Sequence, residues 1–175
     1  MKKIIKAACF ALILVMMFSV LASCSGNGGA EESGVETSEN TVGKTETWGN
    51  IKVYVPAGSK LIGGSLVDGA DQNSLSISSA DGKEYYIVTV LTDDEKAKDS
   101  IASTKEKNPE ETPEEVTLDV DGTVWSGIAY KHADSSESFQ VWAKAGNKIV
   151  LVGADHHAYD SDEAKEVLGS IEIAG

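Results

Sequence analysis

The sequence predicts an α+β domain, an antiparallel β-sheet packed with two main helices, preceded by a signal peptide and a flexible tether. Asp81-Gly82, Asp121-Gly122 and Gly146-Asn147 each lie between segments in which apolar and polar residues alternate. This pattern is typical of β-hairpins, because successive side chains of a strand point to opposite faces. Segments 92–107 and 160–169 carry apolar residues at helical spacing instead. The length of 175 residues and the apolar content of 41% fit one such domain with a modest core.

The N-terminus has the pattern of a secretory signal peptide. Residues 1–6 contain three lysines and no acid, and the apolar run over 7–23 is shorter than the roughly 20 residues of a membrane-spanning helix. Leu21-Ala22-Ser23-Cys24 follows and resembles the lipobox of bacterial lipoproteins. The resemblance implies a signal peptide over 1–23, a palmitate-type lipid on Cys24 and anchoring at the outer face of the cell membrane. The alternatives are an ordinary signal peptide with a chance cysteine and a spanning anchor.

Residues 24–46, which begin with Cys24, are predicted to form a flexible tether ahead of a folded domain over 47–175. The segment consists mainly of Ser, Gly, Asn, Glu and Thr, and Val35 and Val42 are its larger apolar side chains. Such a composition buries too little apolar surface to offset the chain entropy that is lost on folding. We expect the tether to hold the domain away from the bilayer. The alternative is a docking segment that becomes ordered on a partner.

The strands of the domain can be placed in register. The first strand is expected over 51–55, where β-branched residues alternate with Lys52 and Tyr54 and Pro56 ends the run. Counting outward from a two-residue turn then pairs the strands of each hairpin. The expected pairs are Val120 with Thr123, Leu118 with Trp125, Val116 with Gly127, Ile77 with Tyr86, Leu75 with Val88, and Trp142 with Leu151.

Two helices interrupt the strands. Thr92-Asp93-Asp94-Glu95 matches a capping box and predicts a helix to about Lys107, with Ala97 and Ile101 facing inward. A second helix is predicted from about 160 to 169. Its inward side consists of Ala164, Val167 and Leu168, while Ile171 fits either this helix or a short closing strand.

Two motifs at the ends of this layout carry a family resemblance. They are Tyr54-Val55-Pro56-Ala57-Gly58 at the end of the first strand and the closing segment 164–173. With the elements between them, they resemble PsbP-like domains over roughly residues 47–175. The resemblance implies an antiparallel sheet packed between helices and a mostly non-catalytic, extrinsic or secreted binding subunit. Many members carry an aromatic residue shortly after the Pro-x-Gly, where this sequence has Ser59-Lys60.

The charge balance excludes one class of partner. The chain has 15 basic residues, all lysine, against 28 acidic residues, which gives a net charge of −13. A nucleic-acid partner is not expected, because nucleic-acid binders carry a basic surface. Cys9 leaves with the signal peptide and Cys24 would carry lipid, so we expect the mature domain to have neither a disulfide nor a free thiol.

The segment Asp155–Asp162 is the strongest candidate for chemistry. Its residues His156, His157, Asp155 and Asp160 are weak candidates for metal ligands, because imidazole and carboxylate groups bind zinc. Neighbouring side chains on a strand point to opposite faces, so only one histidine could join the carboxylates unless the segment turns. The preferred interpretation is a polar loop that leads into a helix N-terminus, with no metal site.

Trp142 leaves two possibilities open. It lies on the opposite strand face from Phe139 and Val141, together with Lys144. Either a helix covers it or it is exposed, and an exposed Trp142 would be a plausible anchor for a ligand or partner.

These observations predict a membrane-anchored, extracytoplasmic lipoprotein that acts as a non-enzymatic binding or accessory module of the cell envelope. We expect no catalytic residues and no cofactor, because the sequence has no nucleophile elbow, no His-Glu-x-x-His and no glycine-rich phosphate loop. Its partners would be the membrane, through Cys24, and an envelope protein or small ligand that the sequence does not identify. The alternatives are a small envelope hydrolase and a metal or small-ligand scavenger that uses Asp155–Asp162.

Overall fold

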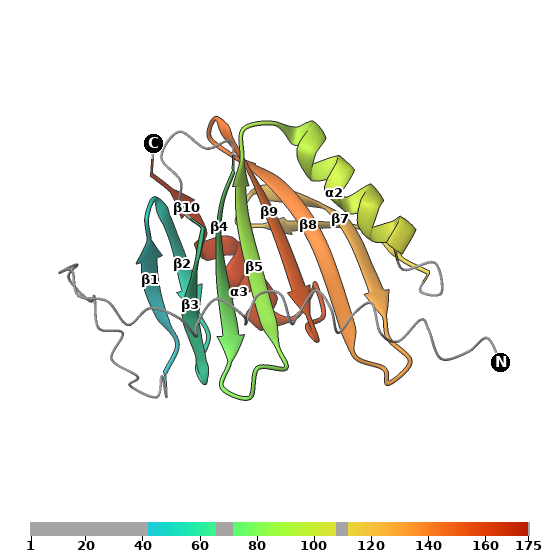
Figure 1. Ribbon diagram of the computed structural model, residues 1–175, viewed down its shortest axis with the longest axis horizontal. Helices are drawn as coiled ribbons and strands as arrows, with labels where there is room; N and C mark the ends of the chain where they lie inside the picture. Colours follow the sequence, from blue (N-terminus) through green and yellow to red (C-terminus); the bar gives the residue numbers. More distant parts are fainter. Residues whose placement is uncertain (1–41, 66–71, 108–111, 175) are drawn as a thin grey trace, which may run out of the picture. The chain divides into compact units, whose positions relative to one another are not determined.

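A computed structural model of the chain describes residues 42–65, 72–107 and 112–174, whose strands form two antiparallel sheets (Figure 1). The small sheet has the order β1-β2-β10, and the large, 7-stranded sheet has the order β3-β4-β5-β9-β8-β7-β6. The predicted signal peptide, Cys24 and the first part of the predicted tether lie outside the described residues. The elements are β1 (Lys44–Trp48), β2 (Ile51–Val55), β3 (Ser59–Ser65), β4 (Gln72–Ser79), β5 (Tyr85–Leu91), α2 (Asp94–Lys107), β6 (Glu114–Val120), β7 (Thr123–Lys131), β8 (Glu137–Ala145), β9 (Lys148–Asp155), α3 (Asp162–Ser170) and β10 (Glu172–Ile173).

The two helices cover opposite faces of the large sheet, which confirms the predicted α+β class (Figure 1). On β9, Val150 and Val152 pack in the larger core cluster with α3 and with β2 of the small sheet. Ile149 and Leu151 face the other way and pack in a second cluster with α2. Because β9 is the middle strand and is covered on both sides, its buried stretch is a continuous apolar run rather than an alternation.

The predicted hairpin registers are confirmed. All six expected residue pairs are found in the ladders β4–β5, β6–β7 and β8–β9. At the β6–β7 turn, Asp121 and Gly122 have φ values of 51° and 82°, as a tight turn with two left-handed residues requires. The β4–β5 connection keeps its predicted register but is longer than two residues, since β4 ends at Ser79 and β5 begins at Tyr85.

The helices agree with prediction except at one cap. Helix α2 ends at Lys107 and buries Ala97 and Ile101, as expected. Its cap is Asp93 rather than Thr92, because the Glu95 N–H donates to Asp93 Oδ1 at 2.9 Å. Among the described residues, neither helix has the length and apolar character that crossing a membrane requires. Helix α3 is capped by Ser161 and buries Ala164, Val167 and Leu168, while Ile171 follows the helix and precedes β10.

The small sheet contains a strand that the sequence analysis missed. Strand β1 begins at Lys44, three residues before the predicted domain boundary at residue 47, and pairs antiparallel with β2. Its composition is polar, so its pattern does not stand out from that of the tether. The strand is held by its ladder with β2 and by Trp48, which packs against the larger core cluster.

Two glycines of the large sheet provide a matched test of how closely strands β7 and β8 approach each other. A Cβ at Gly127 of β7 would lie 2.0 Å from the carbonyl oxygen of Gln140 on β8, whereas a Cβ at Gly153 of β9 would meet no atom within 4 Å. We expect Gly127→Ala to lower the free energy of unfolding by about 1–3 kcal/mol, and Gly153→Ala to change it by no more than about 0.5 kcal/mol. Urea denaturation measures both values. Equal losses would contradict the described approach of β7 to β8.

Candidate functional site

The end of β9 distributes neighbouring side chains between the two faces of the large sheet. Asp155 is the last residue of β9, and His156 and His157 follow it. His156 has a φ of 61°, so the chain turns at this residue. As a result, the predicted candidates Asp155 and His156 meet His132, which follows β7, whereas His157 contacts Tyr86.

His132, Ser138, Asp155 and His156 form a group that we call the histidine cluster. Ser138 Oγ lies 2.6 Å from His132 Nε2 and donates to Asp155 Oδ1 at 2.5 Å. The backbone N–H of His156 donates to the same hydroxyl at 3.3 Å. The imidazole rings of His132 and His156 stack with their centroids 5.7 Å apart. A buried serine hydroxyl is therefore the centre of a polar network that joins β8, β9 and the loops beside them.

This network has the residue types of a serine hydrolase but not the geometry. A hydroxyl has one proton, and Ser138 gives it to Asp155. The serine proton is thus directed at Asp155 and not at His132 Nε2, where a general base would have to accept it. The same Nε2 also lies 3.5 Å from Asp155 Oδ1, whereas a triad needs the carboxylate at the other ring nitrogen. Ser138 is only 1% exposed, so a substrate cannot reach it.

The metal candidates do not converge either. Among the described residues, no group of three or more His, Cys, Asp or Glu side chains is arranged to hold a metal ion. His132 Nε2 and His156 Nε2 approach different oxygens of Asp155, at 3.5 and 3.9 Å. His157 contacts other residues, and Asp160 is an exposed residue of the loop before α3.

His157 belongs to a structural contact between β5 and α3. Its ring stacks on Tyr86 with a centroid distance of 4.3 Å, and its Nδ1 lies 3.3 Å from Glu163 Oε1. The Tyr86 hydroxyl donates to the same carboxylate oxygen at 3.1 Å. Burial lowers the pKa of the His157 imidazole, against the opposing attraction of Glu163. Burial and then the Glu163 carboxylate raise the pKa of the Tyr86 phenol.

A groove of about 320 Å³ lies between α2 and strands β6, β7 and β8, and we call it the Trp142 groove. Trp142 is half-buried against the apolar cluster under α2, so the helix covers part of it and the rest forms a wall of the groove. Lys98 Nζ lies 5.6 Å from the centroid of the Trp142 ring, within the range of a cation–π contact. The lining residues are Lys98, Ile101, Ala102, Lys105, Glu115, Val116, Thr117, Ser126, Gly127, Ile128 and Trp142.

Two ion pairs border the groove. Lys98 Nζ lies 2.9 Å from Asp94 Oδ2 one helical turn away, and this hydrogen bond raises the pKa of the Lys98 ammonium. Lys105 Nζ lies 3.1 Å from Glu115 Oε1 and connects α2 to β6. These lysines were not among the predicted site residues. The signal present was their spacing of seven residues with Ile101 and Ala102 between them, which places all four on one side of a helix.

Comparison with known proteins returned a structural likeness only. No protein-family model and no curated protein matches the sequence. Among solved structures, the chain is similar to the solution structure of cyanobacterial PsbP (CyanoP) from Synechocystis sp. PCC 6803, with a TM-score of 0.48 and 14% sequence identity. The likeness covers 88% of this chain and 99% of that chain. This neighbour belongs to the group that the sequence resembles, and it carries no function over to the present chain.

The His157 contact predicts a dependence of stability on pH. Because the folded state lowers the pKa of His157 below its ordinary value of 6.5, the unfolded state binds the proton more readily. This contribution to stability is complete above pH about 6.5 and is lost as the pH falls. His157→Phe, which keeps an aromatic ring on Tyr86, should therefore lose less stability than the parent between pH about 8 and about 5.5. Urea denaturation at both values measures this. If the variant and the parent lost the same amount of stability between the two pH values, the role of the imidazole would be contradicted.

Proposed function

We propose that the protein is a lipid-anchored, extracytoplasmic binding module without enzymatic activity, and that the Trp142 groove is its ligand site. The groove is the observation that carries the proposal. Its volume of about 320 Å³ is within the range of small-molecule sites, and it combines aromatic and apolar walls with a few charged side chains. Specific small-molecule sites have this composition, because apolar contact supplies affinity and the polar groups supply orientation.

The chemistry of the groove supports binding over hydrolysis. Glu115 is the one carboxylate among its lining residues, and these include no histidine. Hydrolysis as in glycosidases generally uses a pair of carboxyl groups on either side of the scissile bond. The hydrolase or scavenger that would use Asp155–Asp162 gains no support, since His156 and His157 have different partners and the Ser138 hydroxyl is committed to Asp155.

The anchoring part of the proposal rests on the lipobox resemblance of Leu21-Ala22-Ser23-Cys24. One acyl chain gives only marginal membrane binding, whereas two or more chains anchor a protein stably. A tether after Cys24 would let the groove meet its ligand away from the bilayer.

We expect Cys24→Ala to move the protein from the membrane fraction to the soluble fraction, because the thiol that carries the lipid is lost. Ser25→Ala is the matched control and should leave the protein in the membrane fraction. Membrane fractionation with metabolic palmitate labelling measures both effects. A Cys24→Ala protein that stays in the membrane fraction would rule out this anchor.

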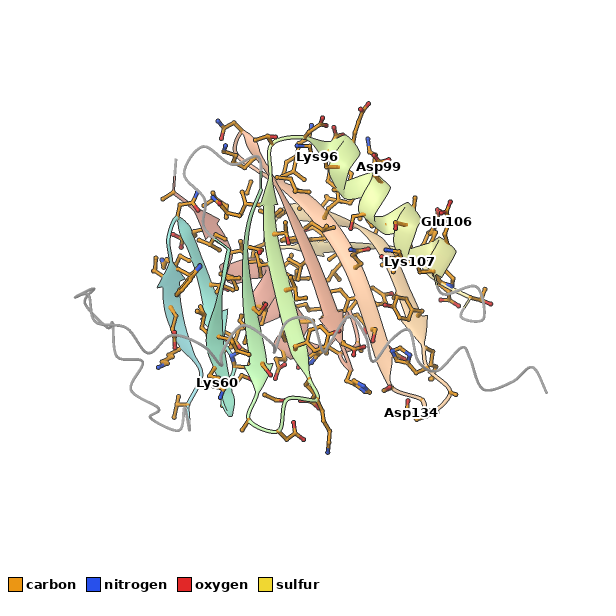
Figure 2. The ribbon with its side chains drawn as sticks, in the orientation of Figure 1. Lys60, Lys96, Asp99, Glu106, Lys107 and Asp134 are labelled. Carbon is orange, nitrogen blue, oxygen red and sulfur yellow. The ribbon has the colours of Figure 1, made fainter. Side chains whose placement is uncertain are left out.

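We expect a nuclear magnetic resonance screen of small aromatic and aliphatic compounds to perturb amide signals of α2, β6, β7 and β8 preferentially. Ala102→Trp places a large side chain into the groove from an exposed position and should abolish these perturbations. Asp99→Trp, on the outer side of the same helix, should preserve them (Figure 2). Perturbations spread evenly over the domain, or unchanged by Ala102→Trp, would contradict the assignment of the site.

A further inference from the structure

The Trp142 groove also indicates the class of its ligand. We propose that it binds small organic anions in which a carboxylate or sulfonate is attached to a flat apolar body. The inference rests on the proposed function, because it takes the groove to be the binding site. It is carried by the charge, exposure and arrangement of the lining residues.

The groove differs in charge from the chain as a whole. The chain carries a net charge of −13, yet at the groove Lys98 and Lys105 balance the two carboxylates that pair with them, Asp94 and Glu115. Charged side chains at a concave, partly apolar surface focus the local potential, and an anion near this groove meets two ammonium groups. The groove is therefore a place on an acidic chain where positive and negative side chains balance, and where two ammonium groups border a cavity of ligand size.

Both lysines are available to an incoming anion. The side chains of Lys98 and Asp94 are 57% and 38% exposed, and those of Lys105 and Glu115 are 37% and 85% exposed. Ion pairs in such contact with water are weak, so a ligand can replace the carboxylate partner at little cost. Asp94 also remains attracted by Lys144 of β8 when Lys98 turns to a ligand.

The apolar part of the ligand follows from the walls. Ile101 of α2 and Ile128 of β7 line the groove with the indole of Trp142. Because Lys98 Nζ is 5.6 Å from the centre of the indole ring, an apolar body against Trp142 places its charged group beside an ammonium. Lys98 lies over the indole ring, so an apolar body would pack beside the ammonium against the rest of the indole and the two isoleucines; aromatic groups also pack edge to face, so the site favours flat bodies.

A cationic ligand fits the groove less well. The faces of tryptophan rings attract cations, and the acidic chain attracts them from a distance. The cation position at Trp142 is already occupied by Lys98, whose ammonium would repel a second positive charge. The arrangement therefore selects against the ligand class that the net charge of the chain alone would favour.

Three naphthalene compounds of similar shape test the ligand class: 2-naphthoate, 2-naphthalenemethanol and 2-naphthylmethylammonium. The protein is purified from cells after natural processing and reconstituted in lipid nanodiscs. Binding is measured by isothermal titration calorimetry, with empty nanodiscs as the blank. We expect the carboxylate to bind about tenfold more tightly than the alcohol, and the ammonium compound to bind most weakly.

Two double variants locate the charge effect. Lys98→Gln with Lys105→Gln removes two charges at the groove. Lys96→Gln with Lys107→Gln removes two charges from the opposite side of α2, because an α-helix turns 100° per residue. The first should weaken 2-naphthoate binding about tenfold, and the second should change it less than about twofold. Because the net charge changes equally in both variants, the difference would come from the position of the lysines.

The outcomes separate this inference from the proposed function. Carboxylate selectivity that is lost only in the Lys98/Lys105 variant supports both. Alcohol or ammonium binding as tight as that of the carboxylate, or equal losses in the two double variants, overturns the anion class but leaves a groove that binds ligands. If none of the three compounds binds and the compound screen perturbs no groove signal, the proposed function fails as well.

Discussion

The structure depends on the burial of the large sheet on both of its faces. Val150 and Val152 of β9 pack toward α3 and the small sheet, while Ile149 and Leu151 pack toward α2. Each fully buried aliphatic side chain stabilises the fold by roughly 1.5–3 kcal/mol, so a strand that is apolar on both faces requires a cover on each. The helices supply these covers, and they are held mainly by the sheet, since a helix as short as α3 is marginal in isolation.

The histidine cluster and the Trp142 groove both lie at the margins of the sheet area that α2 covers. Along β9, the residues on the α2 face change from Leu151 through Gly153 to Asp155 as the strand reaches its end. Asp155 and Ser138, its hydrogen-bond partner on β8, replace apolar packing by a network in which the buried hydroxyl is satisfied from three sides. At the other margin, α2 passes over β6 to β8 and leaves the Trp142 groove between helix and sheet. The histidine cluster thus connects β8, β9 and the adjoining loops by hydrogen bonds, whereas the Trp142 groove is a space that side chains do not fill.

The sequence predicts those features that depend on neighbouring residues. Asp121-Gly122 and Gly146-Asn147 determine their hairpin registers because a tight turn leaves one possible pairing, and Ser161 locates the start of α3 because its hydroxyl caps the first turn. The same reasoning misses β1, whose polar residues form a strand only because β2 offers a ladder. The structure confirms nothing about Cys24 or the first part of the tether, which stay predictions.

Site residues were harder to predict because they meet across long stretches of sequence. The pattern around Asp155 drew attention to the adjacent His156 and His157, yet one of them pairs with His132 and the other with Tyr86. His156 itself has a left-handed φ of 61°, which turns the chain so that the two rings diverge, and no local motif predicts this turn. For Trp142, alternation gave the correct face of β8, but only the position of α2 decides how much of the indole is covered.

Helix α2 has one side that packs on the sheet and another that borders the proposed ligand site. Its position over the sheet is determined by Ala97 and Ile101, which are buried in the apolar cluster. Ile101 also lines the groove together with Ala102, Lys98 and Lys105, and the long side chains of the two lysines end in exposed ion pairs. Long ammonium side chains can move their charged ends while their stems stay packed, so the groove can adapt to a ligand without disturbing the core. Pairs that contribute little to stability are therefore suited to the proposed ligand site, because opening them would cost the fold little.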